Sequence, residues 1–272
     1  MKHTRTLAAG TDAPADVQGR ADPRRVAIDR VGVRGLRHPV RVQDRSGHDQ
    51  ATIARLTMSV ALPHDARGAH MSRFVQLANE LDAPLTVRSF HHLLEAMTER
   101  LGNADGELRI EFPWFRRKRA PVSGVESLMD YEAAFIGRRR DGHNEVWLRV
   151  SAPATSLCPC SKEVSEYGAH NQRSEITLEA RVEDIIWLEE LIEIAEGAAS
   201  SEVYGVLKRT DEKFVTERAY DNPKFVEDMI RDLALALEQD ERIRAYRVGC
   251  ENFESIHNHS AFAELARDKD AD

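Results

Sequence analysis

The sequence predicts an α+β protein built from two modules of the same plan, each with two strands, two helices and two further strands. Apolar residues alternate with polar residues in several short segments, which is the pattern of a half-buried strand. In other segments the apolar residues recur at helical spacing and share one face. The order of these segments before residue 141 is repeated after it, although the residue identities are not.

The first module begins with strands. The clearest strand covers Arg55 to Leu62, where alternate residues are apolar, and a weaker strand precedes it at Val40 to Asp44. Two helices and then two strands follow. The apolar faces of the two helices are Phe74, Leu77, Ala78 and Leu81, and Phe90, Leu93, Leu94, Met97 and Leu101. The apolar residues of the two strands are Leu108, Ile110 and Phe112, and Tyr131, Ala133 and Phe135.

The second module follows a hairpin turn expected at Asp141-Gly142. Strands at Val146 to Val150 and Ile176 to Val182 flank a polar loop. Asp184 is the expected N-cap of a helix, and Asn222-Pro223 the expected start of another, with Pro at the first helical position. The apolar stripe of the first helix is Leu188, Leu191, Ile192 and Ala195, and that of the second is Phe225, Val226, Met229, Ile230, Leu233 and Leu237. Two final strands are expected at Ile243 to Val248 and at Ser260 to Leu265.

These patterns divide the chain into three parts. Residues 1–25 are expected to form a disordered tail, because Ala, Gly, Asp and Pro dominate the segment and no apolar run resembles a secretory signal. The modules then take residues 26–140 and 141–272, and the second carries most of the candidate site motifs. We expect the two modules to form one unit rather than two independent domains.

The composition narrows the class of protein. With 42% hydrophobic and 31% charged residues in a chain of 272, it is typical of a globular protein. The formal net charge of −8 argues against a nucleic-acid partner, since phosphate binding needs a basic surface. No apolar run approaches the roughly 18 residues that cross a bilayer, so no membrane partner is expected. Three cysteines do not make a disulfide framework, which indicates a cytoplasmic protein.

The polar loop of the second module contains the most unusual chemistry. Cys158 and His170 lie twelve residues apart, and a thiolate and an imidazole are natural ligands for a borderline-soft divalent metal. Pro159 favours an extended Cys158, so Cys158 and Cys160 are not expected on one helical face. The alternative is a structural loop with two inert thiols, and the spacing alone does not decide between them.

Other segments offer further polar groups. His257 and His259 follow a predicted strand, and Glu212 is an exposed carboxylate by composition. Two histidines, one cysteine and one carboxylate suit zinc, iron or manganese, whereas the alternative is a set of solvated polar residues. Glu227 lies near a helix start, off the centre of the buried stripe. It is either a solvated carboxylate beside the helix dipole or an acceptor for a guanine-like pair of N–H groups.

Several segments resemble, in order, those of the type IB GTP cyclohydrolase I family. They span residues 28–265 and are Ile28 to Leu36, His70 to Phe74, Thr155 to Glu163, Tyr167 to Arg173, Asp211 to Tyr220 and Ser255 to His259. The resemblance implies a tunnelling fold, in which antiparallel sheets of ββααββ modules close into barrels. It also implies a homotetramer with active sites between subunits.

The resemblance further implies metal-dependent hydrolysis of GTP at C8, which yields 7,8-dihydroneopterin triphosphate and formate for folate and other pterins. One divalent zinc, manganese or iron ion is expected per site. The implied metal ligands are Cys158, His170, Glu212 and His257, and the implied guanine anchor is Glu227. The expected catalytic residues are Cys158, His170 and His259, the last as a base. Candidates for holding the triphosphate, by proximity to the motifs, are Lys162, Arg173 and Lys208.

Two other functions compete with this one. A nitrile reductase of the queuosine pathway has the same fold, a cysteine and a guanine-anchoring glutamate, but it uses a nicotinamide cofactor and no catalytic metal. The combination of His257 and His259 with Cys158 and His170 favours the metal enzyme. A non-catalytic metal-binding protein is the second alternative, and it would need no guanine anchor at Glu227.

Overall fold

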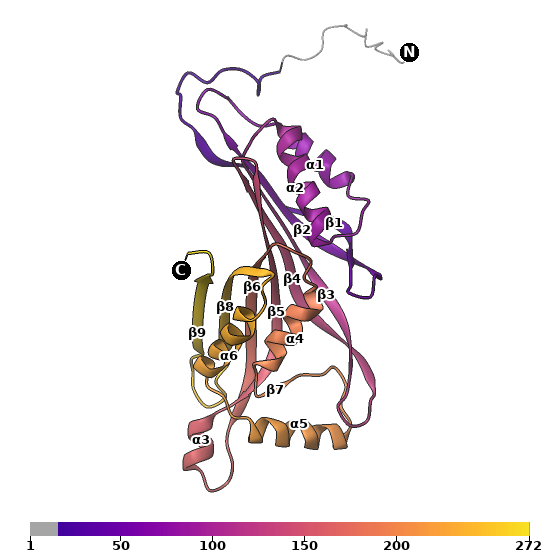
Figure 1. Ribbon diagram of the computed structural model, residues 1–272, viewed down its shortest axis with the longest axis vertical. Coiled ribbons are helices and arrows are strands. Elements are labelled where there is room, and N and C mark those ends of the chain that lie inside the picture. The colour runs from indigo at the N-terminus through magenta and orange to yellow at the C-terminus, as the bar shows by residue number, and fades with distance from the viewer. Residues whose placement is uncertain (1–15, 272) are drawn as a thin grey trace, which may run out of the picture.

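The computed structural model describes residues 16–271, and their strands form one nine-stranded sheet (Figure 1). The order is β1-β2-β3-β4-β5-β6-β8-β9, every paired strand is antiparallel, and the short β7 pairs with β5. The strands are β1 Ile28–Gln43, β2 Asp49–Leu62, β3 Gly106–Arg119, β4 Glu126–Arg140, β5 His143–Leu157, β6 Asn171–Val182, β7 Ser201–Glu202, β8 Ile243–Asn252 and β9 Ala261–Asp268. The helices are α1 Met71–Asn79, α2 Val87–Leu101, α3 Pro159–Val164, α4 Leu188–Gly197, α5 Arg209–Asp221 and α6 Val226–Glu238.

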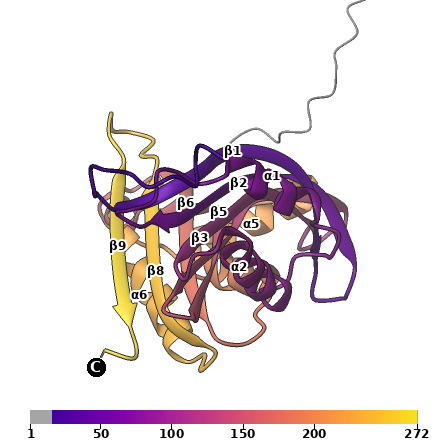
Figure 2. The same cartoon turned by 90° about the horizontal axis from the view of Figure 1, so that it is seen from above.

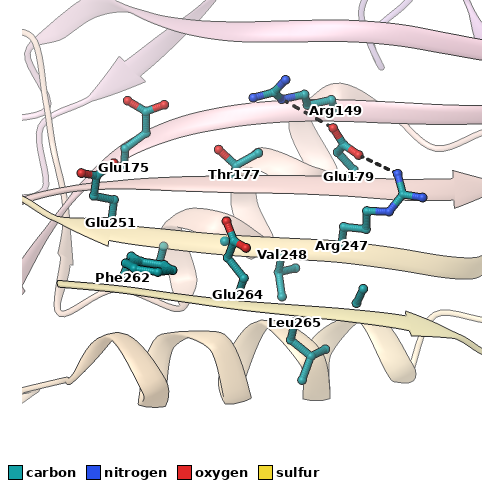
Figure 3. Close-up of a pocket in the computed structure, with 13 residues that line it drawn as sticks. Arg149, Glu175, Thr177, Glu179, Arg247, Val248, Glu251, Phe262, Glu264 and Leu265 are labelled. Atoms are coloured by element: carbon teal, nitrogen blue, oxygen red, sulfur yellow. Dashed lines mark hydrogen bonds and ion pairs between the residues drawn. The ribbon is translucent and has the colours of Figure 1, made fainter. Parts of the chain in front are cut away.

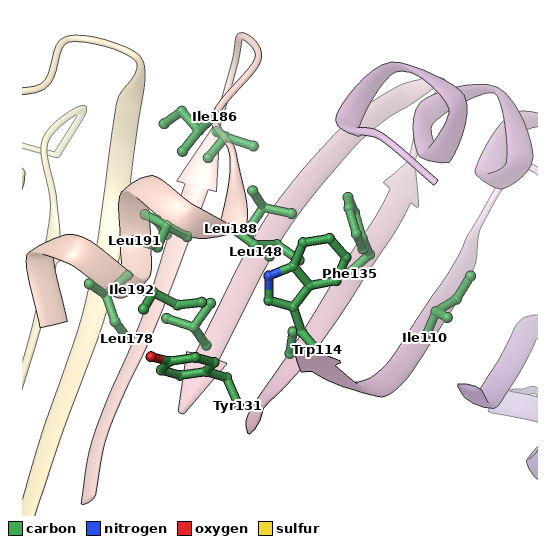
Figure 4. Packing of buried hydrophobic residues seen from close by; sticks show 14 of the residues in the cluster. Ile110, Trp114, Tyr131, Phe135, Leu148, Leu178, Ile186, Leu188, Leu191 and Ile192 are labelled. Carbon is green, nitrogen blue, oxygen red and sulfur yellow. The ribbon is translucent and has the colours of Figure 1, made fainter. Parts of the chain in front are cut away.

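Alternate residues of the strands are buried against the helices and form one continuous core. In its middle, Trp114 and Leu148 of the sheet lie near Leu188 and Leu191 of α4 (Figure 4). The sheet is curved, and β1 and β9 are its two edges (Figure 2). The other face of the sheet therefore keeps its polar side chains outside this core.

The expected strands are present, and most extend beyond the expected residues. The weak strand at Val40 to Asp44 is the end of the sixteen-residue β1. The hairpin turn at Asp141-Gly142 is confirmed, because φ is 48° at Asp141 and 80° at Gly142, and β4 and β5 flank it directly. Positive φ at both positions explains why an Asp-Gly pair turns the chain here.

The expected N-cap at Asp184 is wrong. The helix begins at Leu188, and its N-cap is Trp187, whose N–H donates to Glu190 Oε2 at 2.8 Å. Asp184 Oδ1 instead accepts from Ile185 N at 2.6 Å. Between Asp184 and the helix, Ile186 is buried in the core. The helix begins only after this residue, with its N-cap three residues beyond Asp184.

The expected helix start at Asn222-Pro223 is also wrong. Asn222 is the C-cap of α5, and α6 begins at Val226 with Asp228 Oδ2 accepting from Phe225 N at 3.1 Å. The segment between the helices stays extended because Lys224 N donates to Leu157 O at 3.1 Å. This bond joins the start of α6 to the end of β5.

Two helices were not expected. The six-residue α3 lies in the predicted polar loop, with Pro159 at its first position. The helix α5 carries Glu212 and buries only Asp211 and Ala219. Without an apolar stripe, α5 has no periodic signal to detect.

The first fifteen residues of the expected tail, 1–15, lie outside the described part of the chain. After them, Gln18 Nε2 donates to Ala69 O at 3.2 Å, and Asp22 N donates to Asp65 O at 2.9 Å. Among the residues that the structure describes, none of the helices has the length and apolar content of a membrane span.

A buried ion cluster joins the β3–β4 hairpin to the second half of the chain. Lys118 Nζ is 2.8 Å from Glu196 Oε1 and 2.5 Å from Glu202 Oε2, and it donates to Val203 O at 2.9 Å. Tyr131 OH donates to Glu196 Oε1 at 2.7 Å. Burial, and then the Glu196 carboxylate, raise the pKa of Tyr131 well above its usual value, so the hydroxyl remains a donor.

Replacing Lys118 should therefore destabilise the protein strongly. Lys118→Met removes the cation but leaves the Glu196 and Glu202 carboxylates in place, and we expect a loss of about 3–5 kcal/mol in the free energy of unfolding. Urea unfolding at fixed protein concentration measures this loss. The control is Arg117→Met, which breaks an exposed pair with Glu126 and should cost less than about 1 kcal/mol. Equal losses would contradict the structural role of the buried cluster.

Candidate active site

Cys158 and His170 meet where the β5–β6 ladder ends. The last paired residues of the ladder are Leu157 and Asn171, so Cys158 and His170 are the next residues outward. Cys158 N donates to His170 O at 3.1 Å. Ser161 Oγ accepts from His170 N and donates to Cys158 O, both at 3.1 Å. The structure thus brings together these two sequence-predicted residues.

The thiol of Cys158 has a defined setting. Cys158 is extended, with φ −67° and ψ 117°, as the following Pro159 favours, and it is the N-cap of α3. Ser161 N donates to Cys158 Sγ at 3.5 Å. Cys158 is partly buried, whereas Cys160 is exposed, and both are free thiols. The two cysteines of the motif are therefore not equivalent.

The C-terminal histidine loop starts beside the same imidazole. His170 Nδ1 is 3.4 Å from Ser255 Oγ, and Phe253 N donates to Arg173 O at 2.9 Å. Beyond this attachment His257 and His259 are exposed, and their rings stack with centroids 5.1 Å apart. The loop that carries both histidines therefore begins at the Cys158–His170 corner.

Glu227 lies in the first turn of α6, rather than on the second turn that the expected helix start implied, and it is exposed. The preceding segment is fixed to β5, since Ser156 Oγ donates to Lys224 O at 2.9 Å, next to the bond between Lys224 N and Leu157 O. The exposed Glu227 carboxylate therefore follows, three residues later, a segment that is hydrogen-bonded to the end of β5 next to Cys158.

Glu212 is separated from this corner. The contact between α3 and α5 is made at the far end of α5, where Lys162 Nζ donates to Tyr220 O and lies 4.2 Å from the Tyr220 ring centroid. Glu212 precedes Tyr220 by eight residues, a rise of about 12 Å along a helix. Within residues 16–271 of one chain, no three His, Cys, Asp or Glu side chains are placed to hold a metal.

The neighbour of Glu212 holds this end of α5 against the β3–β4 turn. The buried Asp211 carboxylate accepts from Val122 N, Ser123 N and Lys208 N at 2.8 Å, and from Ser123 Oγ at 2.6 Å. Burial by itself would raise the pKa of Asp211, but these hydrogen bonds outweigh it and hold the pKa well below its usual value. Asp211 therefore stays ionised and positions the first turn of α5.

Two of the basic candidates, Lys162 and Lys208, lie at opposite ends of α5. Lys162 is engaged by Tyr220, and Lys208 is the exposed N-cap of α5 at the Glu212 end. Arg173 is exposed near the start of β6. Arg173 and Lys208 therefore remain accessible to an anionic ligand.

A pocket of about 630 Å³ lies away from this corner, on β5, β6, β8 and β9. Figure 3 shows Arg149 and Arg247 directed to Glu179, at 3.8 and 3.3 Å. None of the sequence-predicted site residues lines this pocket. Its acidic side chains belong to the sheet face opposite the core.

Two buried polar residues were not expected at the site from the sequence: Gln172, whose Oε1 lies 3.0 Å from His170 Nδ1, and Asp211. Gln172 has the same strand parity as the buried Ile176 and Leu178, so the alternation, extended backward, was the signal that it faces inward. Asp211 offered a weaker signal, because Lys208 N is its local partner, whereas Val122 and Ser123 are remote in sequence.

The family model of type I GTP cyclohydrolase folE2 matches residues 15–263. The GTP cyclohydrolase FolE2 of Nitrosococcus oceani is 56% identical over 254 residues, which cover 93% of this chain and 95% of that protein. FolE2 of Halorhodospira halophila is 57% identical, over 93% of this chain and 98% of that protein.

A solved structure resembles the fold. Uricase from Arthrobacter globiformis superposes with a TM-score of 0.54 at 9% identity, over 90% of this chain and 94% of that chain. At this identity the likeness concerns the fold alone.

Loss of the Asp211 carboxylate should loosen the start of α5. In Asp211→Asn an amide N–H₂ faces donors, so we expect hydrogen exchange over residues 209–213 to accelerate by about tenfold or more, the effect of losing a hydrogen bond to a charged group. Hydrogen–deuterium exchange with mass spectrometry measures this. Asp228→Asn, which removes the corresponding cap of α6, should leave α5 unchanged. Unaltered exchange in Asp211→Asn would contradict the positioning role.

Proposed function

The chain belongs to the type I GTP cyclohydrolase FolE2 family, and we infer that it is a GTP cyclohydrolase, which hydrolyses GTP at C8 and releases that carbon as formate. The observation that carries this function is a relative 56% identical across 93% of the chain. The meeting of Cys158 with His170 at the end of β5 supports it, because it supplies two chemically suitable ligands at one corner. The product is 7,8-dihydroneopterin triphosphate, which feeds folate and other pterins.

We propose that Cys158, His170 and His257 of one subunit and Glu212 of another hold a divalent metal. One thiolate, two imidazoles and one carboxylate form a donor set that accepts zinc, manganese or iron. Cys158 and His170 fit this role, and Ser255 brings the His257 loop to the same imidazole. A bound metal would supply the Lewis acidity that lowers the pKa of water towards neutrality for attack on C8.

The substrate contacts come from exposed side chains. Glu227 accepts hydrogen bonds from the paired N–H groups of guanine and fixes the ring. His259 accepts and returns protons while the imidazole ring opens. Lys162, Arg173 and Lys208 hold the triphosphate, and Lys162 must exchange its contact with Tyr220 for a phosphate oxygen.

The proposed assembly is a homotetramer of tunnelling-fold subunits with shared sites. The separation of Glu212 from Cys158 along α5 supports a site completed by a second copy of the chain. The two outer strands of the sheet, β1 and β9, also support association, because a strand at a sheet edge can pair with a strand of another copy. The three free cysteines support a cytoplasmic location.

Metal-dependent turnover tests the function. Protein stripped of metal and reloaded with zinc, manganese or ferrous iron should release formate from GTP and give a fluorescent neopterin after oxidation. Cys158→Ala should lower turnover by on the order of 100-fold or more, since metal catalysis contributes several kcal/mol. Cys160→Ala, the exposed thiol two residues away, should retain activity. Full turnover in Cys158→Ala, or consumption of NADPH with a deazaguanine nitrile instead, would refute the proposal.

Sharing of sites predicts complementation between inactive variants. Cys158→Ala and Glu212→Ala subunits should each be inactive. A coexpressed equal mixture should recover about a quarter of the wild-type rate if subunits associate at random. A site is intact when its Cys158 comes from a Glu212→Ala subunit and its Glu212 comes from a Cys158→Ala subunit, and each condition is met in about half of the sites. A mixture as inactive as its parents would mean that each site takes all its residues from one chain.

A further inference from the structure

We propose that Gln172 is a positioning residue that fixes the tautomer of His170 and presents its Nε2 to the metal, an inference that rests on the proposed ligand role of His170. His170 Nδ1 lies 3.0 Å from Gln172 Oε1. Since an amide oxygen only accepts, this contact requires the hydrogen on Nδ1. The lone pair for a metal is then on Nε2.

The orientation of the Gln172 amide follows from a buried polar cluster. Gln172, Ser156, Ser174 and Asn252 are all buried, and they are contributed by β5, β6 and β8. Buried polar groups must be hydrogen-bonded, so the directions of these bonds constrain one another. The cluster lies between His170 and the segment that leads into α6.

The chain of donors starts at a backbone carbonyl. Lys224 O can only accept, so Ser156 Oγ uses its single hydrogen to donate to it at 2.9 Å. Ser156 Oγ must then act as an acceptor towards its other neighbours. It accepts from Asn252 Nδ2 at 3.1 Å and from Gln172 Nε2 at 3.4 Å.

These assignments leave one role for each end of the Gln172 amide. The Nε2 end is directed to Ser156, so Oε1 is directed to His170. Asn252 is fixed in the same way, because Ser174 Oγ donates to Asn252 Oδ1 at 2.6 Å. A flipped Gln172 would put an N–H group against His170 Nδ1 and an oxygen against a hydroxyl whose hydrogen is already used.

The second neighbour of the imidazole agrees with this arrangement. Ser255 Oγ is 3.4 Å from the same Nδ1, farther than Gln172 Oε1. The Ser255 hydroxyl oxygen can also accept from the Nδ1 hydrogen, in a bifurcated hydrogen bond. Both neighbours contact Nδ1, so neither occupies Nε2. The cluster also links His170 to Lys224, three residues before Glu227. The histidine and the proposed guanine anchor therefore take their positions from one buried network.

The affinity for metal measures this role independently of catalysis. In Gln172→Leu the acceptor is lost, and the dissociation constant for Mn²⁺ or Zn²⁺, measured on stripped enzyme by chelator competition, should rise by about 10- to 100-fold. Gln172→Glu keeps an acceptor towards Nδ1 but places a second oxygen against Ser156 Oγ, so its metal affinity should fall less than that of Gln172→Leu. Ser151→Ala removes a hydrogen bond of β5 that lies outside this cluster, and its affinity should not change.

The outcomes separate this inference from the proposed function. Wild-type affinity in Gln172→Leu, or equal weakening in Gln172→Leu and Gln172→Glu, would overturn the positioning role. His170→Ala is the reference: if it does not weaken metal binding, the proposed ligand set itself is wrong. If Gln172→Leu does not assemble, Ser156→Ala serves instead, because it frees the amide to flip. That variant should weaken binding in the same direction, and unchanged affinity would overturn the inference.

Discussion

The antiparallel pairing of β5 with β6 is unbroken from Trp147↔Arg181 to Leu157↔Asn171, and the candidate site depends on where this ladder ends. Its register sets Cys158 opposite His170. A slip of one residue would also move Gln172 from the core face to the opposite face, because side chains alternate along a strand. The apolar residues of β6 resist such a slip, so hydrophobic burial fixes the geometry of the polar site.

Buried polar groups extend this register to the rest of the site. Ser156, on the core face near the end of β5, binds the backbone of Lys224 and so sets the start of α6 and Glu227. Asp211 performs a similar task at the other end of α5, where it attaches the chain beside Glu212 to the β3–β4 turn. The two exposed carboxylates proposed for the site, Glu212 and Glu227, are thus each positioned by a buried, hydrogen-bonded side chain.

The strands and the hairpin could be predicted because burial leaves a period in the sequence. The stripe of α6, which includes Met229 and Leu233, was detectable for the same reason. The start of α6 was not, because the segment from Asn222 is held by a bond to β5 that no local pattern reveals. The polar helix α5 escaped prediction because its stability comes from Asp211 and tertiary contacts rather than from an apolar face.

The candidate site was predictable in its residue identities but not in its spatial arrangement. The resemblance supplied Cys158, His170, Glu212 and His257 as a set. The structure brings Cys158 and His170 together, and it leaves Glu212 at the far end of α5 within one chain. Short motifs in the sequence indicate which residues could be metal ligands. The assembly that would bring these residues together depends on surfaces between subunits, which no local motif describes.

An anomalous-scattering map of the metal-loaded crystalline assembly would test this account most directly. We expect one metal about 2.0–2.3 Å from Cys158 Sγ, His170 Nε2 and His257 of one subunit, with Glu212 contributed by a neighbouring subunit. Ligation through His170 Nδ1, or a complete set of ligands from a single chain, would contradict it.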